Sequence, residues 1–170
     1  MTIQKSYSQE EIDRLISCPK EITKPPHKEM RSDRGHLRND MDLREIDGKA
    51  DFSVYIRINE TFRENFSIGL DYYPGDEPGA VPLIRCNGQH SEHNPDPLHG
   101  GTAHYDFHVH RVTAAAIDDG ASPLKEAHRT EKYASFEEAL RYFIRITGIK
   151  DADRHFPQLR QPSLFPEVEP

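Results

Sequence analysis

Six of the ten histidines in this chain lie between residues 90 and 110. The last three belong to the stretch HYDFHVH, residues 104–110. Because successive side chains of a strand point to opposite faces, a strand here would gather three imidazoles and one carboxylate on one face. These four residues are His104, Asp106, His108 and His110. The alternate residues Tyr105, Phe107 and Val109 would face the core, so we expect the histidine face to look outward.

The first chemistry that such a cluster could perform is metal binding. Two histidines at alternate strand positions, such as His108 and His110, have Cα atoms about 7 Å apart and can share one zinc ion. His93 would be a third ligand, and the alternatives for completing the site are His90, His104, Asp106 and Cys86. No Cys-x-x-Cys or His-Glu-x-x-His motif accompanies them, so the spacing alone does not define a metal site.

The second chemistry is metal-independent cleavage of RNA. It needs a general base for the 2′-hydroxyl proton, a general acid for the leaving oxygen, and a cation that holds the phosphate. Imidazole titrates near pH 6.5 and serves in either proton role. The candidates are His108 and His110 for proton transfer, His104 or His90 as further partners, and Arg85 or Arg111 for the phosphate. Strict alternation places Arg111 on the face opposite His110, unless a bulge or strand end turns it.

The third interpretation is a polar surface that performs no chemistry. Outward histidines are common on solvated sheet faces, and residues 87–103 (NGQHSEHNPDPLHGGTA) form a long polar segment. Long connections in compact domains are usually functional or disordered. The sequence leaves all three interpretations open.

Alternation of apolar and polar residues predicts the strands that would position this cluster. The predicted strands span residues 37–46, 51–59, 65–73, 81–86 and 104–110. Since short turns join most of them, we expect an antiparallel meander.

Two helices are predicted to accompany the sheet. The first covers YSQEEIDRLISCPK, where Ser8 and Glu11 have the spacing of a capping box. The second covers SFEEALRYFIRITGI, where Ser135 and Glu138 have the same spacing and Gly148 suits the end of the helix. The predicted fold class is α+β: an antiparallel sheet of about five strands, with the C-terminal helix packed on one face and a short N-terminal helix.

We divide the chain into three parts. Residues 1–35 would be the N-terminal helix and a polar linker, residues 36–149 the α+β domain, and residues 150–170 a mobile tail that is charged and rich in proline.

Composition restricts the class of protein further. A chain of 170 residues with 35% hydrophobic residues fits one domain with polar extensions. Its formal net charge of −7 argues against broad, non-specific binding to nucleic acid, although a small basic site is compatible with it. No stretch approaches the roughly 18 apolar residues that cross a bilayer, and we expect no membrane association and a cytoplasmic location. Cys18 and Cys86 are expected to be free thiols.

The segments LIRCNGQHSEH and HYDFHVHRVT resemble an uncharacterised bacterial family that carries RYNG…H…N and PHIHRAT stretches. They are more loosely similar to TumE-type toxins of toxin–antitoxin pairs, which carry RYDN…HH and HHKH segments. The similarity runs from about residue 40 to residue 149, and EKYASFEEALRYFI is similar to the closing helix of the first family.

The toxin resemblance implies a small α+β protein that acts on RNA and is held in check by a helix-turn-helix antitoxin. The residues that carry over are His108, His110 and Arg111 from HIHR, and Asn87, Gly88 and His90 from YNGPH. This chain departs from the pattern because Cys86 replaces the tyrosine and Phe107 precedes His108.

A separate motif lies in the tail. Residues 161–165 (QPSLF) are similar to the pentapeptide by which bacterial polymerases and repair proteins bind the sliding clamp. Gln161 would form hydrogen bonds, and Leu164 and Phe165 would fill an apolar groove. The alternative is that the two apolar side chains fold back on the domain itself.

Two functional hypotheses follow. The first is a toxin-like or defence-associated protein whose histidine-lined site acts as a ribonuclease. The second is a non-enzymatic binding module, in which the histidines hold zinc or nothing and the tail recruits the protein to a sliding clamp.

Overall fold

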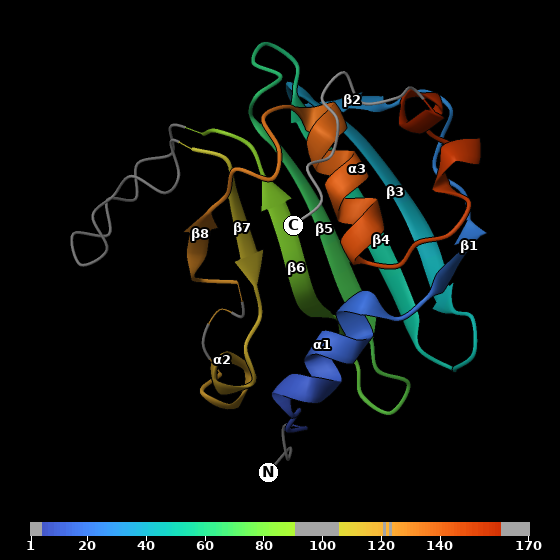
Figure 1. Ribbon diagram of the computed structural model, residues 1–170, viewed down its shortest axis with the longest axis vertical. Helices are drawn as coiled ribbons and strands as arrows, with labels where there is room; N and C mark the ends of the chain where they lie inside the picture. Colours follow the sequence, from blue (N-terminus) through green and yellow to red (C-terminus); the bar gives the residue numbers. More distant parts are fainter. Residues whose placement is uncertain (1–4, 91–105, 121, 123, 161–170) are drawn as a thin grey trace, which may run out of the picture.

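One antiparallel sheet with helices packed against it forms the body of the protein (Figure 1). The computed structural model describes residues 5–90, 106–120, 122 and 124–160. Within these residues, the strands are β1 (Lys20–Lys24), β2 (Arg31–Asp33), β3 (His36–Glu45), β4 (Asp51–Asn59), β5 (Phe66–Tyr73), β6 (Val81–Asn87), β7 (His108–Arg111) and β8 (Ala127–Arg129). The helices are α1 (Gln9–Ser17), α2 (Ala114–Asp118) and α3 (Phe136–Ile146), and two 3₁₀ turns follow at Ala152–Arg154 and Pro157–Arg160.

The strand order is β1-β3-β4-β5-β6-β7-β8, with β2 also paired to β3. Every strand pair is antiparallel, and β3 to β8 are neighbours in chain order. The predicted α+β class, the antiparallel meander and the two helices are therefore confirmed.

The predicted number of strands is wrong: the described residues form eight strands and not about five. The five predicted strands correspond to β3–β7, and the additional ones are β1, β2 and β8. Exposed side chains predominate in these three short strands, and all three residues of β2 are exposed. A strand that is solvated on both faces needs no alternating apolar residues, so the periodicity that identifies strands is missing there.

Residues 20–35, which we expected to be a linker, instead supply β1 and β2. Both strands pair with the same edge of β3, at opposite ends of it. The side chain of Asn39 bridges the gap between them, because it accepts a hydrogen bond from the His27 N–H at 2.9 Å and donates to the His27 carbonyl oxygen at 3.0 Å. The Asn39 side-chain amide therefore forms the two hydrogen bonds that a backbone partner would form in a continuous strand.

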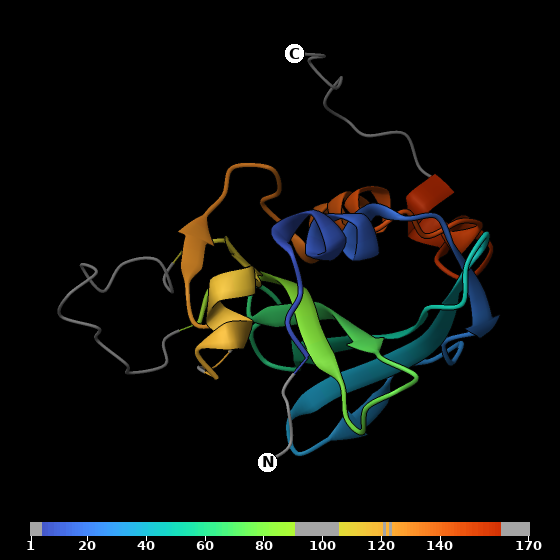
Figure 2. The same cartoon turned by 90° about the horizontal axis from the view of Figure 1, so that it is seen from below.

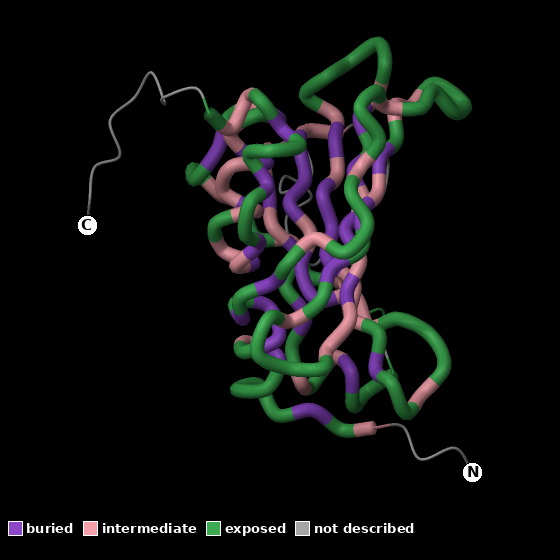
Figure 3. Tube along the Cα trace, turned by 90° about the vertical axis from the view of Figure 1, so that its right-hand side faces the viewer, coloured by how far each residue is buried: buried purple, intermediate pink, exposed green. Residues whose placement is uncertain are grey.

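The hydrophobic core lies on one face of the sheet, beneath α1 and α3 (Figure 2). The buried helix residues are Ile12, Leu15 and Ile16 from α1, and Phe136, Ala139, Leu140 and Phe143 from α3. They meet the inward side chains of β3–β6. Figure 3 shows the buried stretches gathered in the interior of the molecule, with exposed stretches around them. The predicted alternation of β4 is confirmed, since its inward residues are all buried: Phe52, Val54, Ile56 and Ile58.

Both helix starts follow the predicted capping pattern, with one difference. Ser8 and Glu11 form a complete capping box on α1. Ser135 caps α3 by accepting a hydrogen bond from the Glu138 N–H, but the Glu138 carboxylate accepts from the N–H of Ala134 at 2.7 Å and not from Ser135. Gly148 follows α3 with a φ of 69°, as expected for the end of a helix.

The segment after α3 is partly packed. Phe156 and Ala152 are buried against the core, and Leu159 packs beside them, so residues 150–160 do not match the expected mobile tail. Residues 161–170, with the clamp-like motif, lie outside the described residues. Among the described helices, none has the length and apolar character needed to cross a membrane.

Candidate functional site

The pairing of β6 with β7 brings the candidate residues together. Arg85 lies directly opposite His110, and Asn87 lies directly opposite His108. Residues that face each other across an antiparallel ladder point to the same side of the sheet. All four side chains therefore share the face that lies away from α1 and α3.

This face is not a solvated surface at β7. The exposed fractions are 0% for His108, 2% for His110 and 3% for Asn87. Val109 and Phe107 pack against the core, as predicted, and the histidine side chains project from the opposite face. These two histidines therefore lie on the face away from the helices, as predicted, but they are buried there and not exposed to solvent. Their burial disfavours the third interpretation, a solvated polar surface that performs no chemistry, because buried polar groups need hydrogen-bond partners.

The ring of His108 is held at both nitrogens. Its Nδ1 lies 2.8 Å from the backbone oxygen of Asp106, and its Nε2 lies 3.2 Å from the Asn87 side-chain nitrogen. A carbonyl oxygen only accepts, so Nδ1 carries a proton. With the Asn87 amide nitrogen as the donor, Nε2 accepts, which corresponds to the Nδ1–H tautomer. The strand begins at His108 rather than at residue 104, which leaves the Asp106 carbonyl available for this contact.

Three imidazoles form a row. The ring of His108 lies 5.1 Å from the ring of His110 and 5.1 Å from that of His90, with edge-on geometry in both pairs. His90 belongs to the connection that follows β6. Side chains from the strand and from the neighbouring connection thus converge, as the RNA-cleavage hypothesis requires.

The core side of the same strands supports the row. The hydroxyl oxygen of Tyr133 lies 2.8 Å from the His108 carbonyl oxygen and 3.0 Å from that of Asn87, so its one proton is shared between the ends of β6 and β7. Beside it lies Cys86, whose pKa burial raises to about 12. Cys86 faces the core together with Val109 and does not join the histidines.

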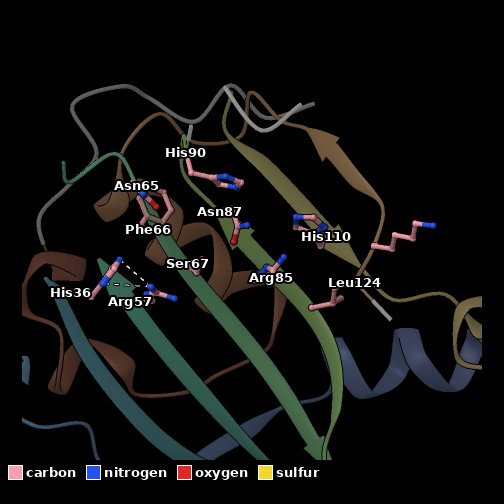
Figure 4. Close-up of a pocket in the computed structure, with 11 residues that line it drawn as sticks. His36, Arg57, Asn65, Phe66, Ser67, Arg85, Asn87, His90, His110 and Leu124 are labelled. Atoms are coloured by element: carbon pink, nitrogen blue, oxygen red, sulfur yellow. Dashed lines mark hydrogen bonds between the residues drawn. The ribbon is translucent and has the colours of Figure 1, made fainter. Parts of the chain in front are cut away.

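A pocket of about 370 Å³ opens beside this row (Figure 4). The described residues that line it are His36, Arg57, Asn65, Phe66, Ser67, Arg85, Asn87, His90, His110, Leu124 and Lys125. We call it the polar pocket. Three of these residues are formally cationic, three are histidines, and no aspartate or glutamate is among them. The polar pocket is thus positive in a chain whose formal net charge is −7.

Arg85 lies in the wall of the polar pocket, next to Tyr55. Gly69 separates them in the sheet, and a side chain at Gly69 would collide with the Tyr55 ring. Burial raises the pKa of Tyr55, and the charge of Arg85 opposes this rise. Two buried atoms of the wall, Arg85 Nε and Asn87 Oδ1, make no hydrogen bond to a described residue.

Two predicted residues have other positions. Arg111 lies opposite Ile84, on the helix-facing side, and its guanidinium contacts the Asp13 carboxylate of α1 at 2.9 Å. It therefore does not reach the polar pocket, as strict alternation indicated. Gly88 has a packing role: its N–H donates to the Phe66 carbonyl oxygen, and a Cβ there would collide with the Glu64 carbonyl oxygen and the Phe66 ring.

The remaining candidates cannot be placed. His93 and His104, and the tail residues Gln161, Leu164 and Phe165, lie outside the described residues.

Among the cationic and histidine side chains that line the polar pocket, the sequence analysis missed three: His36, Arg57 and Lys125. Alternation in residues 51–59 did place Arg57 on the outward face, but nothing local indicated that this face continues to the histidines. That information lies in the register of β4, β5 and β6.

Within the described parts of the chain, no group of three or more histidine, cysteine, aspartate or glutamate side chains is arranged to hold a metal ion. Because the predicted third ligand, His93, is not described, zinc binding by His108 and His110 stays a hypothesis.

No protein-family model, curated protein sequence or solved structure matches this chain. The resemblances noted for residues 40–149 therefore stay predictions.

Proposed function

We propose that the polar pocket binds the phosphodiester backbone of RNA and cleaves it by general acid–base catalysis. The observation that carries this proposal is the charge of the polar pocket: Arg57, Arg85 and Lys125 line it, and no carboxylate is among the described lining residues. Guanidinium and ammonium groups are the usual protein contacts of phosphate.

Arg85 is the best-placed phosphate contact. It lies opposite His110, and its buried Nε makes no hydrogen bond to a described residue. A phosphate oxygen in the polar pocket would accept from this N–H. Of the two arginines that the sequence offered as phosphate contacts, we therefore assign this role to Arg85. Arg111 pairs with Asp13 and has no role in the proposal.

His90 and His110 are the proton-transfer residues in this proposal, because both line the polar pocket. His108 lies between them and is not among the lining residues. Its two nitrogens are engaged by Asp106 and Asn87, so we assign it a positioning role.

The reaction follows from these positions. One imidazole removes the proton of the 2′-hydroxyl, whose oxygen attacks the phosphorus, and the bond to the 5′-oxygen breaks. The other imidazole protonates that leaving oxygen. The products are a 2′,3′-cyclic phosphate and a 5′-hydroxyl, and Arg85 stabilises the charge that develops on the phosphate.

The same charges weigh against a metal ion in the polar pocket. A divalent cation there would be repelled by Arg85, Arg57 and Lys125, and no lining carboxylate in the described residues offsets them. The zinc hypothesis would need His93 and a position nearer His108.

The test is cleavage of a labelled oligoribonucleotide by the purified chain in the presence of a chelator. The wild-type chain should form products that end in a cyclic phosphate, and a 2′-deoxy oligonucleotide should stay intact. His110→Ala and His90→Ala should each slow cleavage by about 100-fold or more. Arg85→Ala should slow it by a similar factor.

His128→Ala is the matched control. His128 is exposed on β8, lies opposite Val109 and so points to the other face of the sheet. Its substitution should leave the rate unchanged. Oligonucleotide binding without cleavage in the wild-type chain would instead support the binding-module hypothesis.

A toxin-like role extends this proposal to the cell. Induced expression of the wild-type chain should slow bacterial growth, and His110→Ala should relieve the effect at equal protein levels. Equal growth inhibition by both chains would reject RNA cleavage as the cause.

A further inference from the structure

We infer that the polar pocket contains a second phosphate subsite, formed by Arg57 and His36, and that its ligand is a single strand of nucleic acid lying across β4 to β7. The inference rests on the proposed function for the choice of nucleic acid as ligand. It adds a minimum length for that ligand and the path that the ligand takes across the strands.

The ladder pairs place one row of side chains across the whole sheet. Arg38, Arg57, Ser67, Asn87, His108 and Arg129 are successive cross-strand partners from β3 to β8. Partners in a ladder share a face, and three members of this row, Arg57, Ser67 and Asn87, line the polar pocket. Figure 4 shows Arg57 and His36 on one side, and Arg85, Asn87, His90 and His110 on the other.

The two ends are too far apart for one phosphate. Arg57 is on β4, and Arg85, the proposed contact of the first phosphate, is on β6, which is two strands away. Neighbouring strands are about 4.8 Å apart, so the two arginines leave the sheet about 10 Å apart. A ligand that contacts both ends must carry at least two phosphates along an extended backbone.

The arginines of the row differ in how their charge is balanced. Arg38 pairs with the Asp33 carboxylate at 3.1 Å, and Arg129 lies 3.5 Å from that of Asp106. Arg57 has no carboxylate within ion-pair distance among the described residues, and its guanidinium lies 3.0 Å from His36 Nε2. The contact orients the guanidinium while leaving its positive charge uncompensated.

Besides Arg85, the lining residues on β5 and β6 that share the face of Arg57 are polar and uncharged. They are Ser67 and Asn87, and Asn65 lines the polar pocket as well. The one aromatic side chain among the described lining residues other than histidine is Phe66, which is 1% exposed. Little ring surface is therefore presented to bases, and we expect recognition of the backbone with little sequence preference.

The experiment measures binding of 2′-O-methyl oligonucleotides, which cannot be cleaved by this route. A dinucleotide with a single phosphodiester and a hexanucleotide are compared by fluorescence anisotropy. Arg57→Ala should weaken binding of the hexanucleotide about tenfold, since a charged hydrogen bond is lost. Binding of the dinucleotide should change less than twofold, whereas Arg85→Ala should weaken both.

Arg44→Ala is the control variant. Arg44 lies on the same face of the sheet, at the other end of β3, where it pairs with Asp51 at 2.8 Å. The Arg44→Ala substitution removes one positive charge, as Arg57→Ala does, but at a position outside the polar pocket. The salt dependence adds a second readout: Arg57→Ala should reduce the slope of log K against log salt by about 0.7, and Arg44→Ala should not.

Three results would overturn the inference: equal effects of Arg57→Ala and Arg44→Ala, equal effects of Arg57→Ala on the two ligands, or tighter binding of an acidic peptide than of the hexanucleotide. Cleavage of RNA without a length-dependent effect of Arg57→Ala would remove the subsite and leave the proposed function. A length-dependent effect of Arg57→Ala without any cleavage of RNA would keep the subsite and reject the proposed ribonuclease activity.

Discussion

At the scale of single residues, the environment of His108 determines what this side chain can do. Its ring is fully buried between a backbone acceptor at Asp106 and an amide donor at Asn87. Such a ring is fixed in orientation and in the position of its proton. It can hold the neighbouring rings of His90 and His110 at a constant distance, which is what a proton-transfer pair needs.

The proton on His108 can be observed directly. We expect imidazole ¹⁵N–¹H correlation spectra to show the Nδ1–H form for this residue. Asn87→Ala should shift the Nε2 resonance, because that nitrogen loses its donor. Asn65→Ala, at another wall of the polar pocket, should leave it unchanged. An Nε2–H pattern in the wild-type chain would contradict the assigned positioning role.

At the scale of elements, α1, β1 and α3 meet at one buried lysine. Lys20 is 0% exposed, and its ammonium donates to the backbone oxygens of Ile16 and Cys18, at 2.8 and 2.9 Å, and of Thr147, at 2.8 Å. Two of these oxygens belong to the end of α1, and the third to the end of α3. A cation is favourable at a helix C-terminus, and here one cation serves two helices.

Substitution of this lysine should destabilise the fold. Lys20→Met keeps most of the side-chain volume but leaves three buried carbonyl oxygens without their donor. We expect the free energy of unfolding to fall by about 3 kcal/mol. Urea-induced unfolding, followed by circular dichroism, would measure the change.

Lys24→Met is the control on the same strand, since Lys24 is exposed and lies 3.7 Å from Asp40. An exposed ion pair of this kind contributes less than about 1 kcal/mol. Equal stability of the two variants would show that the contacts of Lys20 do not hold the helices.

At the scale of the whole molecule, the sheet separates the hydrophobic core from the candidate site. One face carries α1, α3 and the core, and the other carries the row of polar side chains from Arg38 to Arg129. The site can therefore contain buried polar groups, because stability comes from the opposite face. Cys86 belongs to the core face although its chain neighbours, Arg85 and Asn87, line the polar pocket.

This separation predicts the reactivity of Cys86. The thiol is 0% exposed, and burial raises its pKa to about 12, so the thiolate is scarce in the folded chain. In a Cys18→Ser background, we expect labelling by a disulfide reagent to require global unfolding. The labelling rate should then increase with urea in parallel with the unfolding equilibrium. Rapid labelling independent of urea would indicate local opening of the β6–β7 region.

Much of the fold could be predicted from the sequence, because the signals for its main strands and helices lie within short segments of the chain. Apolar alternation in β3–β6 and the capping residues Ser8 and Ser135 are properties of short segments, and each was recognised from its neighbours in the chain. The edge strands β1, β2 and β8 were missed because they exist through pairing with a neighbour and show little apolar pattern.

For the candidate site, residue type and spacing identified His90, His108, His110 and Arg85, but not His36, Arg57 or Lys125. Tertiary structure alone established which of them meet. Cross-strand register aligned Arg57 with Ser67, Asn87 and His108, which come from three other strands. Register depends on pairing between distant segments, and a shift of one residue would exchange the two faces, so no local pattern could reveal it.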